Sequence, residues 1–117
     1  MTAVQTDSSS EFFMSLLPLI AAAELTDGAG REVVAAGRIF AVYRDGDHYH
    51  VLDGICPHAG GPLGKGTLQT GVVTCPWHGW QFHVDSGQHC LSSEICATRW
   101  PAEIEDGMIC IRLEQSE

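Results

Sequence analysis

Two short turns of the chain share one pattern, Cys56-Pro57-His58 and Cys75-Pro76-Trp77-His78. Each turn offers one thiolate and one imidazole, both of which are good ligands for transition metals. A proline follows each cysteine and stiffens the backbone before the ligands meet a metal. Sixteen residues separate His58 from Cys75. The pattern predicts that the two turns face each other across one metal centre.

The ligand set leaves two kinds of metal centre open. Two cysteines and two histidines can hold zinc, although structural zinc sites usually keep their two sulfurs in one turn and their two histidines in another. Here each turn is mixed. Two mixed turns that face each other bring both sulfurs to one side and both imidazoles to the other. This division suits a binuclear centre, with Cys56 and Cys75 on an inner iron and His58 and His78 on an outer one.

Glycine is concentrated around the same turns. Seven of the thirteen glycines lie between residues 54 and 79. A long surface loop would explain this composition. Glycine is also expected where the backbone approaches a cofactor closely and directs its N–H groups toward it.

The length and charge of the chain restrict its function. Its 117 residues suffice for one domain, and fifteen acidic against six basic residues give a formal net charge of −9. This balance argues against nucleic acid or an anionic membrane as a partner and favours a basic protein surface. We expect a component of a larger system, not a complete multidomain enzyme.

The N-terminal part of the chain imitates a signal peptide. Residues 12–23 are apolar and small, but no Lys or Arg precedes them, and they are too few to span a bilayer. We interpret residues 1–14 as a flexible segment and residues 15–117 as a single domain. Five cysteines, an odd number, favour a reducing cytoplasm or thiolates bound to metal over a disulfide scaffold.

Short apolar runs separated by turn residues predict an all-β fold, a small antiparallel sandwich or barrel. Within this domain, about residues 54–84 are expected to form a loop-rich subdomain that carries the metal centre. The expected strands are Leu19–Ala22, Glu32–Ala35, Arg38–Tyr43, His48–Leu52, Val72–Cys75, Gln81–Val84 and Met108–Leu113.

The extended turns resemble the two cluster-binding boxes of Rieske [2Fe–2S] proteins. The first reads Cys56-Pro57-His58-Ala59-Gly60-Gly61-Pro62-Leu63, and the second reads Cys75-Pro76-Trp77-His78-Gly79-Trp80-Gln81-Phe82. Asp85-x-Gly87 follows the second box, as it does in that family. The resemblance covers about residue 19 to the C-terminus. It implies the Rieske fold and one [2Fe–2S] cluster, bound by Cys56, His58, Cys75 and His78.

The resemblance also bears on the subtype. Respiratory-chain members carry an additional cysteine in each box, which together form a disulfide, but the corresponding positions here are Gly61 and Trp77. Those members also have a hydrogen-bonding serine where this chain has Trp80. We therefore expect a reduction potential near the low end of the Rieske range of about −150 to +300 mV.

The pattern is most similar to the soluble Rieske-type ferredoxins of bacterial aromatic-ring dioxygenase systems. This implies a non-catalytic electron carrier, a cytoplasmic monomer that passes one electron from a flavoprotein ferredoxin reductase to a terminal oxygenase. Neither nucleic acid nor a membrane is expected as a partner. Two alternatives remain open, the small Rieske-like subunit of an assimilatory nitrite reductase and a zinc-binding interaction module.

Other residues have less specific interpretations. Trp77 suits either a docking rim or ordinary packing, whereas Trp80 is expected to pack beneath the loop and Lys65 to lie in solvent. Alternation along the strand predicts that His83 is a surface imidazole or a satisfied, half-buried one, and not a metal ligand. His48 and His50 share one face of a strand, which favours an exposed polar face over a metal site. No pattern gives His89 a role.

The remaining cysteines and the C-terminal acids are also open to simple interpretations. Cys90, Cys96 and Cys110 are expected to be small core residues or inert thiols, and a bond between Cys90 and Cys96 is an alternative. The C-terminal acids face only Arg112 and suggest a solvated surface that also steers a basic partner. They are Glu103, Glu105, Asp106, Glu114 and Glu117.

Overall fold

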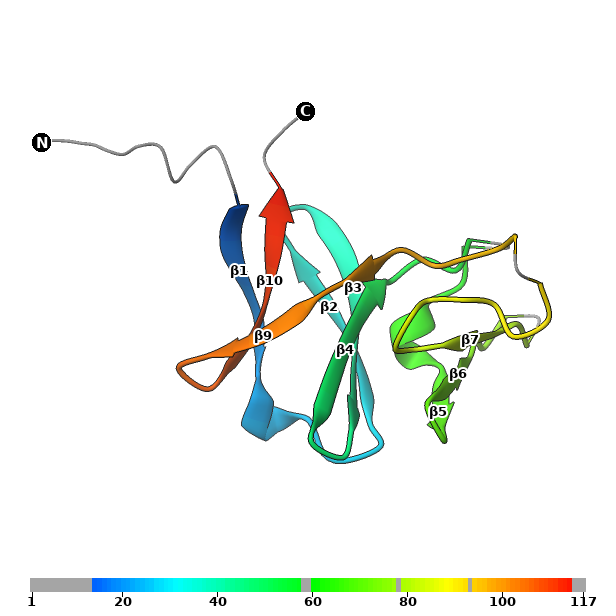
Figure 1. Ribbon diagram of the computed structural model, residues 1–117, viewed down its shortest axis with the longest axis horizontal. Helices are drawn as coiled ribbons and strands as arrows, with labels where there is room; N and C mark the ends of the chain where they lie inside the picture. The colour runs from blue at the N-terminus through cyan, green and yellow to red at the C-terminus, as the bar shows by residue number, and fades with distance from the viewer. Residues whose placement is uncertain (1–13, 58–59, 78, 93, 115–117) are drawn as a thin grey trace, which may run out of the picture.

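The computed structural model describes residues 14–57, 60–77, 79–92 and 94–114. Antiparallel β-strands dominate this part of the chain, and two short 3-10 turns, η2 and η3, join them (Figure 1). In chain order the elements are β1 (Met14–Ala21), η2 (Ala22–Glu24), β2 (Gly30–Ala35), β3 (Arg38–Asp45), β4 (His48–Asp53), η3 (Leu63–Lys65), β5 (Thr67–Gln69), β6 (Val72–Thr74), β7 (Gln81–His83), β8 (Arg99–Trp100), β9 (Ala102–Glu105) and β10 (Met108–Glu114).

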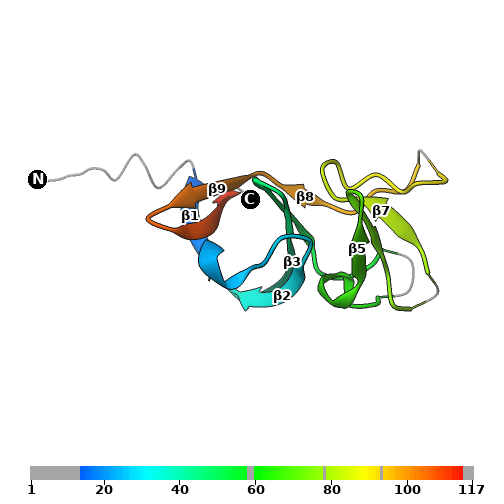
Figure 2. The same ribbon diagram turned by 90° about the horizontal axis from the view of Figure 1, so that it is seen from below.

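Two sheets form the base of the molecule, one in the order β1-β10-β9 and the other in the order β2-β3-β4-β8. The chain passes from one sheet to the other at Pro101, because β8 pairs with β4 and the following β9 pairs with β10. Figure 2 shows these strands curving around a common interior. The expected small antiparallel sandwich or barrel is confirmed.

A third sheet, in the order β5-β6-β7, forms the smaller part of the molecule and lies beside β3 and β4 (Figure 1). The first cysteine turn leaves the end of β4, and the second joins β6 to β7. The loop-rich subdomain expected at residues 54–84 corresponds to this part. It extends further in the structure, because residues 88–90 return along β7 and Gln88 also forms a bridge with Cys96.

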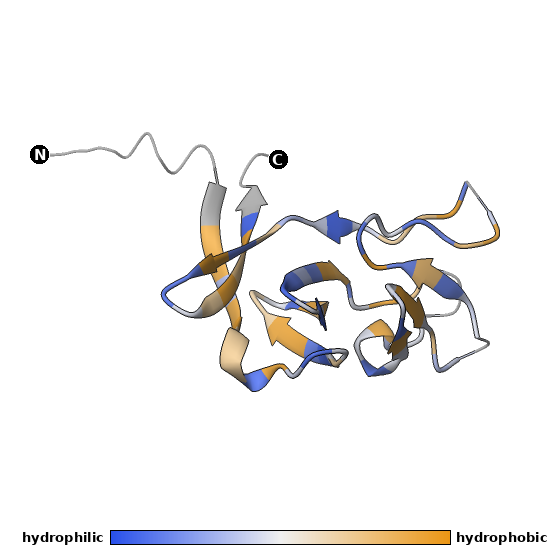
Figure 3. Ribbon diagram, turned by 60° about the horizontal axis from the view of Figure 1, so that its bottom comes forward, coloured by the Kyte–Doolittle hydropathy of each residue, from blue (hydrophilic) through white to orange (hydrophobic). Residues whose placement is uncertain are grey.

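Strand β3 separates two hydrophobic cores. Phe40 and Val42 point into the base core, and Ala41 and Tyr43 point into the core beneath the cysteine turns. All four side chains are fully buried, because the two faces of a strand alternate and both faces of this one are covered. Figure 3 shows apolar residues in both parts of the molecule. The apolar run that predicted a strand thus joins the base to the metal-binding part.

Two-residue turns with a positive φ at both positions close three hairpins. They are Ala36-Gly37, Thr70-Gly71 and Asp106-Gly107. Such turns match the right-handed twist of the strands they connect, and glycine at the second position adopts the left-handed conformation without strain.

Most of the expected strands are present with small shifts of their ends. The first strand begins earlier than expected, at Met14, and residues 22–24 form the 3-10 turn η2. Strands β5, β8 and β9 were not predicted. The flexible segment expected at residues 1–14 lies outside the described residues except for Met14, which begins β1. No helix in the described ranges is long and apolar enough to cross a membrane.

Candidate metal centre

The two cysteine turns close with the same backbone hydrogen bonds. The N–H of Cys56 donates to the carbonyl of Gly61, five residues on, and the N–H of Gly60 donates back to the Cys56 carbonyl (2.8 and 2.9 Å). In the second turn the N–H of Cys75 donates to the carbonyl of Trp80, also five residues on, and the N–H of Gly79 donates back to the Cys75 carbonyl (2.8 and 3.2 Å). The chain therefore builds two equivalent loops, each of which begins at a cysteine.

The two cysteine side chains are buried and lie next to each other. Their exposed fractions are 2% for Cys56 and 1% for Cys75, and both belong to the core beneath the loops. Burial raises the pKa of the Cys75 thiol, and the neighbouring Cys56 thiol raises it further. The Trp77 backbone N–H, which hydrogen-bonds to the Cys75 sulfur, acts in the opposite direction and lowers this pKa. Such a donor would stabilise the thiolate that a metal requires.

The two loops touch where Gly61 meets the second loop. A Cβ atom on Gly61 would lie 2.7 Å from the Cys75 sulfur and 3.0 Å from the Trp77 Cβ. The structure thus leaves room only for glycine against this sulfur. It also makes neighbours of Gly61 and Trp77, the two positions at which respiratory Rieske proteins are expected to carry their disulfide.

The predicted ligands His58 and His78 lie outside the described residues, so the structure brings together the two sulfur ligands of the expected four. In the described part of the chain no three histidine, cysteine or acidic side chains are close enough to hold a metal ion. Two adjacent buried thiols, a backbone donor to sulfur and a bare glycine backbone fit an iron–sulfur cluster, whose irons are held by thiolates and whose sulfurs accept N–H hydrogen bonds.

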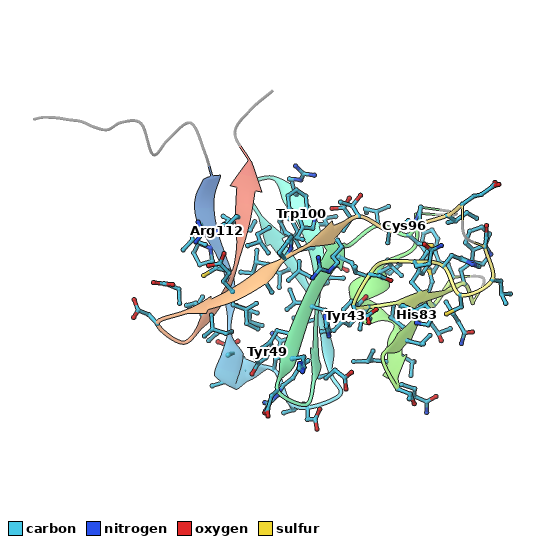
Figure 4. The ribbon with its side chains drawn as sticks, in the orientation of Figure 1. Tyr43, Tyr49, His83, Cys96, Trp100 and Arg112 are labelled. Carbon is cyan, nitrogen blue, oxygen red and sulfur yellow. The ribbon has the colours of Figure 1, made fainter. Side chains whose placement is uncertain are left out.

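Tyr43 supports the first loop from below and was not predicted as a site residue. Its hydroxyl donates a hydrogen bond of 2.8 Å to the Leu63 carbonyl, and its ring is fully buried (Figure 4). Burial raises the pKa of Tyr43 above its usual value, and the nearby Cys75 raises it further. The sequence shows only an apolar strand here, and nothing local reveals the partner of the hydroxyl group.

The aromatic residues of the second loop have different environments. Trp77 is 51% exposed, which suits a docking rim. Trp80 is half-buried and packs against the core that contains both cysteines, as expected. Lys65, at the end of η3, is exposed, and its interpretation as a solvated lysine agrees with this position.

Three histidines line one open cavity of about 450 Å³ between the base hairpin and the third sheet. His48 and His83 are exposed, as predicted, whereas His50 is half-buried, with its ring 6.5 Å from that of His48. Asp45 and Asp85 also line the cavity. Burial lowers the pKa of His50, and His48 lowers it further.

His89 is buried against the second loop and was given no role by the sequence. It is 9% exposed, and its ring contacts those of Trp80 and Phe82 edge-to-face. In the sequence, the one feature that could have pointed to His89 as a site residue is its position shortly after the second turn. Its partners become visible only in the folded chain.

The five cysteines are free thiols, and the alternative bond between Cys90 and Cys96 is not formed. Cys110 is buried, and burial together with nearby acidic side chains raises its pKa, which agrees with an inert thiol. Cys90 is half-buried and Cys96 is exposed (Figure 4). Arg112 forms an exposed ion pair with Glu103, one of the C-terminal acids.

Proteins of known structure contain the same fold. The chain superimposes with a TM-score of 0.76 on a component of the complex of reduced oxygenase and oxidized ferredoxin in carbazole 1,9a-dioxygenase, at 30% identity, covering 87% of this chain and 96% of that one. A putative NADH-dependent nitrite reductase small subunit from Mycobacterium tuberculosis gives a TM-score of 0.79 at 20% identity and covers 88% and 98% of the two chains. The second likeness concerns the fold alone.

Relatives by sequence include two ferredoxins. Ferredoxin CarAc of Metapseudomonas resinovorans is 38% identical over 101 residues, which cover 85% of this chain and 94% of that protein. The ferredoxin component of the alkene monooxygenase system of Xanthobacter autotrophicus is 39% identical over 67 residues, 56% of this chain. The match spans about half of that relative's length (55%).

The family model of the Rieske [2Fe-2S] domain matches residues 15–97. This range contains both loops, all four predicted ligands and the whole of the third sheet. The cofactor of this domain is one Rieske [2Fe–2S] cluster. Because the family model matches most of the chain, including both cysteine loops, the chain belongs to the Rieske [2Fe-2S] domain family.

Proposed function

We propose that the chain is a one-electron carrier that delivers electrons to a terminal oxygenase. In this proposal Cys56 and Cys75 hold one iron of the cluster, and His58 and His78 hold the other. The observation that carries the proposal is the pair of equivalent loops, closed by the same hydrogen bonds, with their two cysteine sulfurs buried side by side. No catalytic residue is assigned, because the chain's role is transfer and not substrate conversion.

The cluster, when bound, accepts and releases one electron at a potential raised by its two neutral imidazole ligands. The chain's residues control what surrounds it. The buried cysteines keep water from the sulfur side, and the Trp77 N–H provides a hydrogen bond to the Cys75 sulfur. Gly61 lets the first loop lie against this sulfur without a side chain between them. The exposed Pro57 and Pro76 lie directly beside the cysteines at the surface end of the loops.

The surface near the loops is apolar and carries few charges. Exposed side chains here include Ile55, Trp77 and Leu91, with exposed fractions of 47%, 51% and 92%. Between residues 54 and 98 the formally charged residues are Lys65, Asp85 and Glu94, whereas the rest of the chain is strongly acidic. This distribution supports an apolar contact with the redox partner at the cluster end, while the acidic base steers a basic partner from a distance.

The names of the similar proteins support an oxygenase as the electron acceptor. One relative by sequence is the ferredoxin component of an alkene monooxygenase system, and one similar structure is a complex of ferredoxin with oxygenase. We further infer that a flavoprotein reductase supplies the electron and that the carrier acts as a monomer in the cytoplasm. The three cysteines outside the proposed ligand set, Cys90, Cys96 and Cys110, are free thiols, which favours a reducing compartment.

The proposal is tested on the purified protein, prepared anaerobically. Two irons and two sulfides per chain are expected, with visible absorption bleached by dithionite and a rhombic EPR signal in the reduced state. Hyperfine coupling to two histidine nitrogens should be present and should disappear for one nitrogen in His58→Cys and in His78→Cys. A colourless protein that contains zinc after attempted cluster reconstitution would instead indicate a zinc-binding interaction module.

The second candidate function is that of a nitrite reductase small subunit, to which the chain is similar in fold. All four ligands are present in this sequence, which disfavours the cluster-free form of that subunit. The two functions differ in their assembly. A carrier exchanges electrons with its oxygenase in a transient complex. A nitrite reductase subunit would instead purify in a stable complex with its large subunit and would not pass electrons to an oxygenase.

A further inference from the structure

The segment around His89 forms the outer support of the second loop. Residues 88–90 run beside β7, where Phe82 and His89 form an antiparallel bridge. The N–H of Cys90 donates to the Gln81 carbonyl (2.9 Å), and the N–H of His89 donates to the Ile95 carbonyl (3.0 Å). His89 is therefore held in place by backbone contacts on both sides.

The imidazole of His89 makes two kinds of contact. Its ring lies edge-to-face against Trp80, with centroids 4.6 Å apart, and against Phe82 at 5.2 Å. Its Nδ1 accepts a hydrogen bond of 3.0 Å from the Leu91 N–H. Because Nδ1 is the acceptor, the proton of the neutral ring sits on Nε2. This nitrogen is buried and has no hydrogen-bond partner among the described residues.

Trp80 connects this imidazole to the predicted ligands. Its indole packs against the core that contains Cys56 and Cys75. Its carbonyl accepts the hydrogen bond from the Cys75 N–H that closes the second loop (2.8 Å). A displacement of the Trp80 ring would therefore be transmitted to the backbone that holds Cys75, and from there to the electronic environment of the cysteine sulfur.

We propose that His89 is a positioning residue for the second cluster loop. Its ring fixes Trp80, and Trp80 in turn fixes the loop that begins at Cys75. The ring contact performs this role, and the hydrogen bond to Leu91 only orients the imidazole. The inference rests on the proposed ligand set, because Cys75 and His78 belong to this loop. His89 itself lies outside both Cys/His turns, and among the described residues its ring contacts the loop at Trp80.

Three substitutions separate the ring from its hydrogen bond. His89→Phe keeps an aromatic ring and loses the acceptor for Leu91. His89→Asn keeps an acceptor at a similar position and loses the ring. His89→Ala loses both. His83→Ala is the control, because His83 is an exposed histidine on the adjoining strand β7. Each variant is studied as the intact, cluster-loaded chain.

The measurements are the EPR line shape, the reduction potential, the rate of iron loss to a chelator and the melting temperature. We expect His89→Phe and His83→Ala to keep the wild-type line shape and potential. His89→Asn and His89→Ala should give a broadened, shifted EPR signal, a displaced potential and several-fold faster iron loss.

Two results would overturn the proposal. In one, the alanine and asparagine variants melt earlier but keep the wild-type signal and potential, so that His89 only stabilises the fold. In the other, the phenylalanine variant is altered or loses its iron while the asparagine variant is normal, so that the Leu91 hydrogen bond is what matters. Failure of the proposed function is recognised separately, because the wild-type protein itself would then lack iron or histidine-nitrogen coupling.

Discussion

Gly61 of the first loop lies directly against the Cys75 sulfur of the second, so that the two loops interlock through a residue without a side chain. A Cβ at this position would be 2.7 Å from the sulfur and 2.9 Å from the Trp77 Cγ. Real Cβ atoms do not approach other atoms so closely. The Cys75 sulfur ends a short, buried side chain and the Trp77 Cγ carries the indole ring, so neither atom can move away without a shift of its loop. The contact makes the geometry of each loop depend on the other.

Gly61→Ala is therefore expected to lose most of its iron. The added methyl group pushes the two loops apart, and overpacking of this kind typically costs about 1–3 kcal/mol. Iron per chain and the visible absorption measure the loss. Gly107→Ala is the control, because it strains a turn in the base with φ of +80° but meets no atom within 4 Å. An alanine variant that retains a full, spectroscopically normal cluster would show that the loops are not interlocked.

Tyr43→Phe should destabilise the protein by about 0.5–1.5 kcal/mol, because the Leu63 carbonyl loses the buried Tyr43 hydroxyl as a donor and keeps only the N–H of Gly66. Urea unfolding monitored by circular dichroism measures the difference. Tyr49→Phe is the control, since Tyr49 is half-buried in the base hairpin and packs against the base core. Equal stabilities of the two variants would mean that the hydrogen bond to Leu63 contributes little.

The base sheet could be predicted from the sequence because its signals are local. The run from Ile39 to Tyr43 is apolar, and Ala36-Gly37 and Gly46 lie where hairpin turns need them. Strand β5 has one apolar residue, Leu68, and β8 has only two residues in all. These strands exist because β6 and β4 offer them unpaired backbone, which is a tertiary effect.

The same distinction holds for the metal centre. The meeting of the two cysteine turns could be predicted because the spacing within each turn is a local pattern, and both turns occur close together. The supporting residues could not. Tyr43 acts on Leu63, twenty residues away, and His89 acts through Trp80. Only the packing of β3 and of residues 88–90 against the loops creates these contacts.

Acidification should weaken the fold through His50. Burial lowers the pKa of this histidine, and His48 lowers it further, while Asp85 and Asp45 oppose the shift and Arg99 adds to it. The unfolded chain then binds a proton more readily than the folded one as the pH falls below about 6.5. Stability is present above that pH and is lost as the pH falls through the lower, folded pKa.

The loss is measured by urea unfolding between neutral and mildly acidic pH, together with NMR titration of the histidine ring protons. His50→Gln should flatten the pH dependence. His48→Gln should raise the pKa of His50, because it removes a like charge. An unchanged titration of His50 in the His48 variant would contradict the assigned coupling between the two rings.

Replacement of Trp77 by alanine should slow electron transfer to the oxygenase and leave the potential nearly unchanged. Trp77 is half-exposed beside the loops, and its backbone N–H, not its side chain, bonds to the Cys75 sulfur. Truncation of a central interface tryptophan typically costs about 2 kcal/mol in binding, which is about thirtyfold in affinity. Stopped-flow oxidation of the reduced protein by its oxygenase, over a range of oxygenase concentrations, measures this effect.

Val34→Ala is the matched control for Trp77→Ala, because Val34 is an apolar side chain exposed on the base strand β2. It should leave the rate unchanged if the partner docks at the cluster end. Because the surface near the loops carries few charges, the affinity lost in Trp77→Ala should be the same at low and high salt, whereas the association rate should fall with salt in both variants. A Trp77 effect that disappears at high salt would assign the contact to electrostatics and not to the apolar rim.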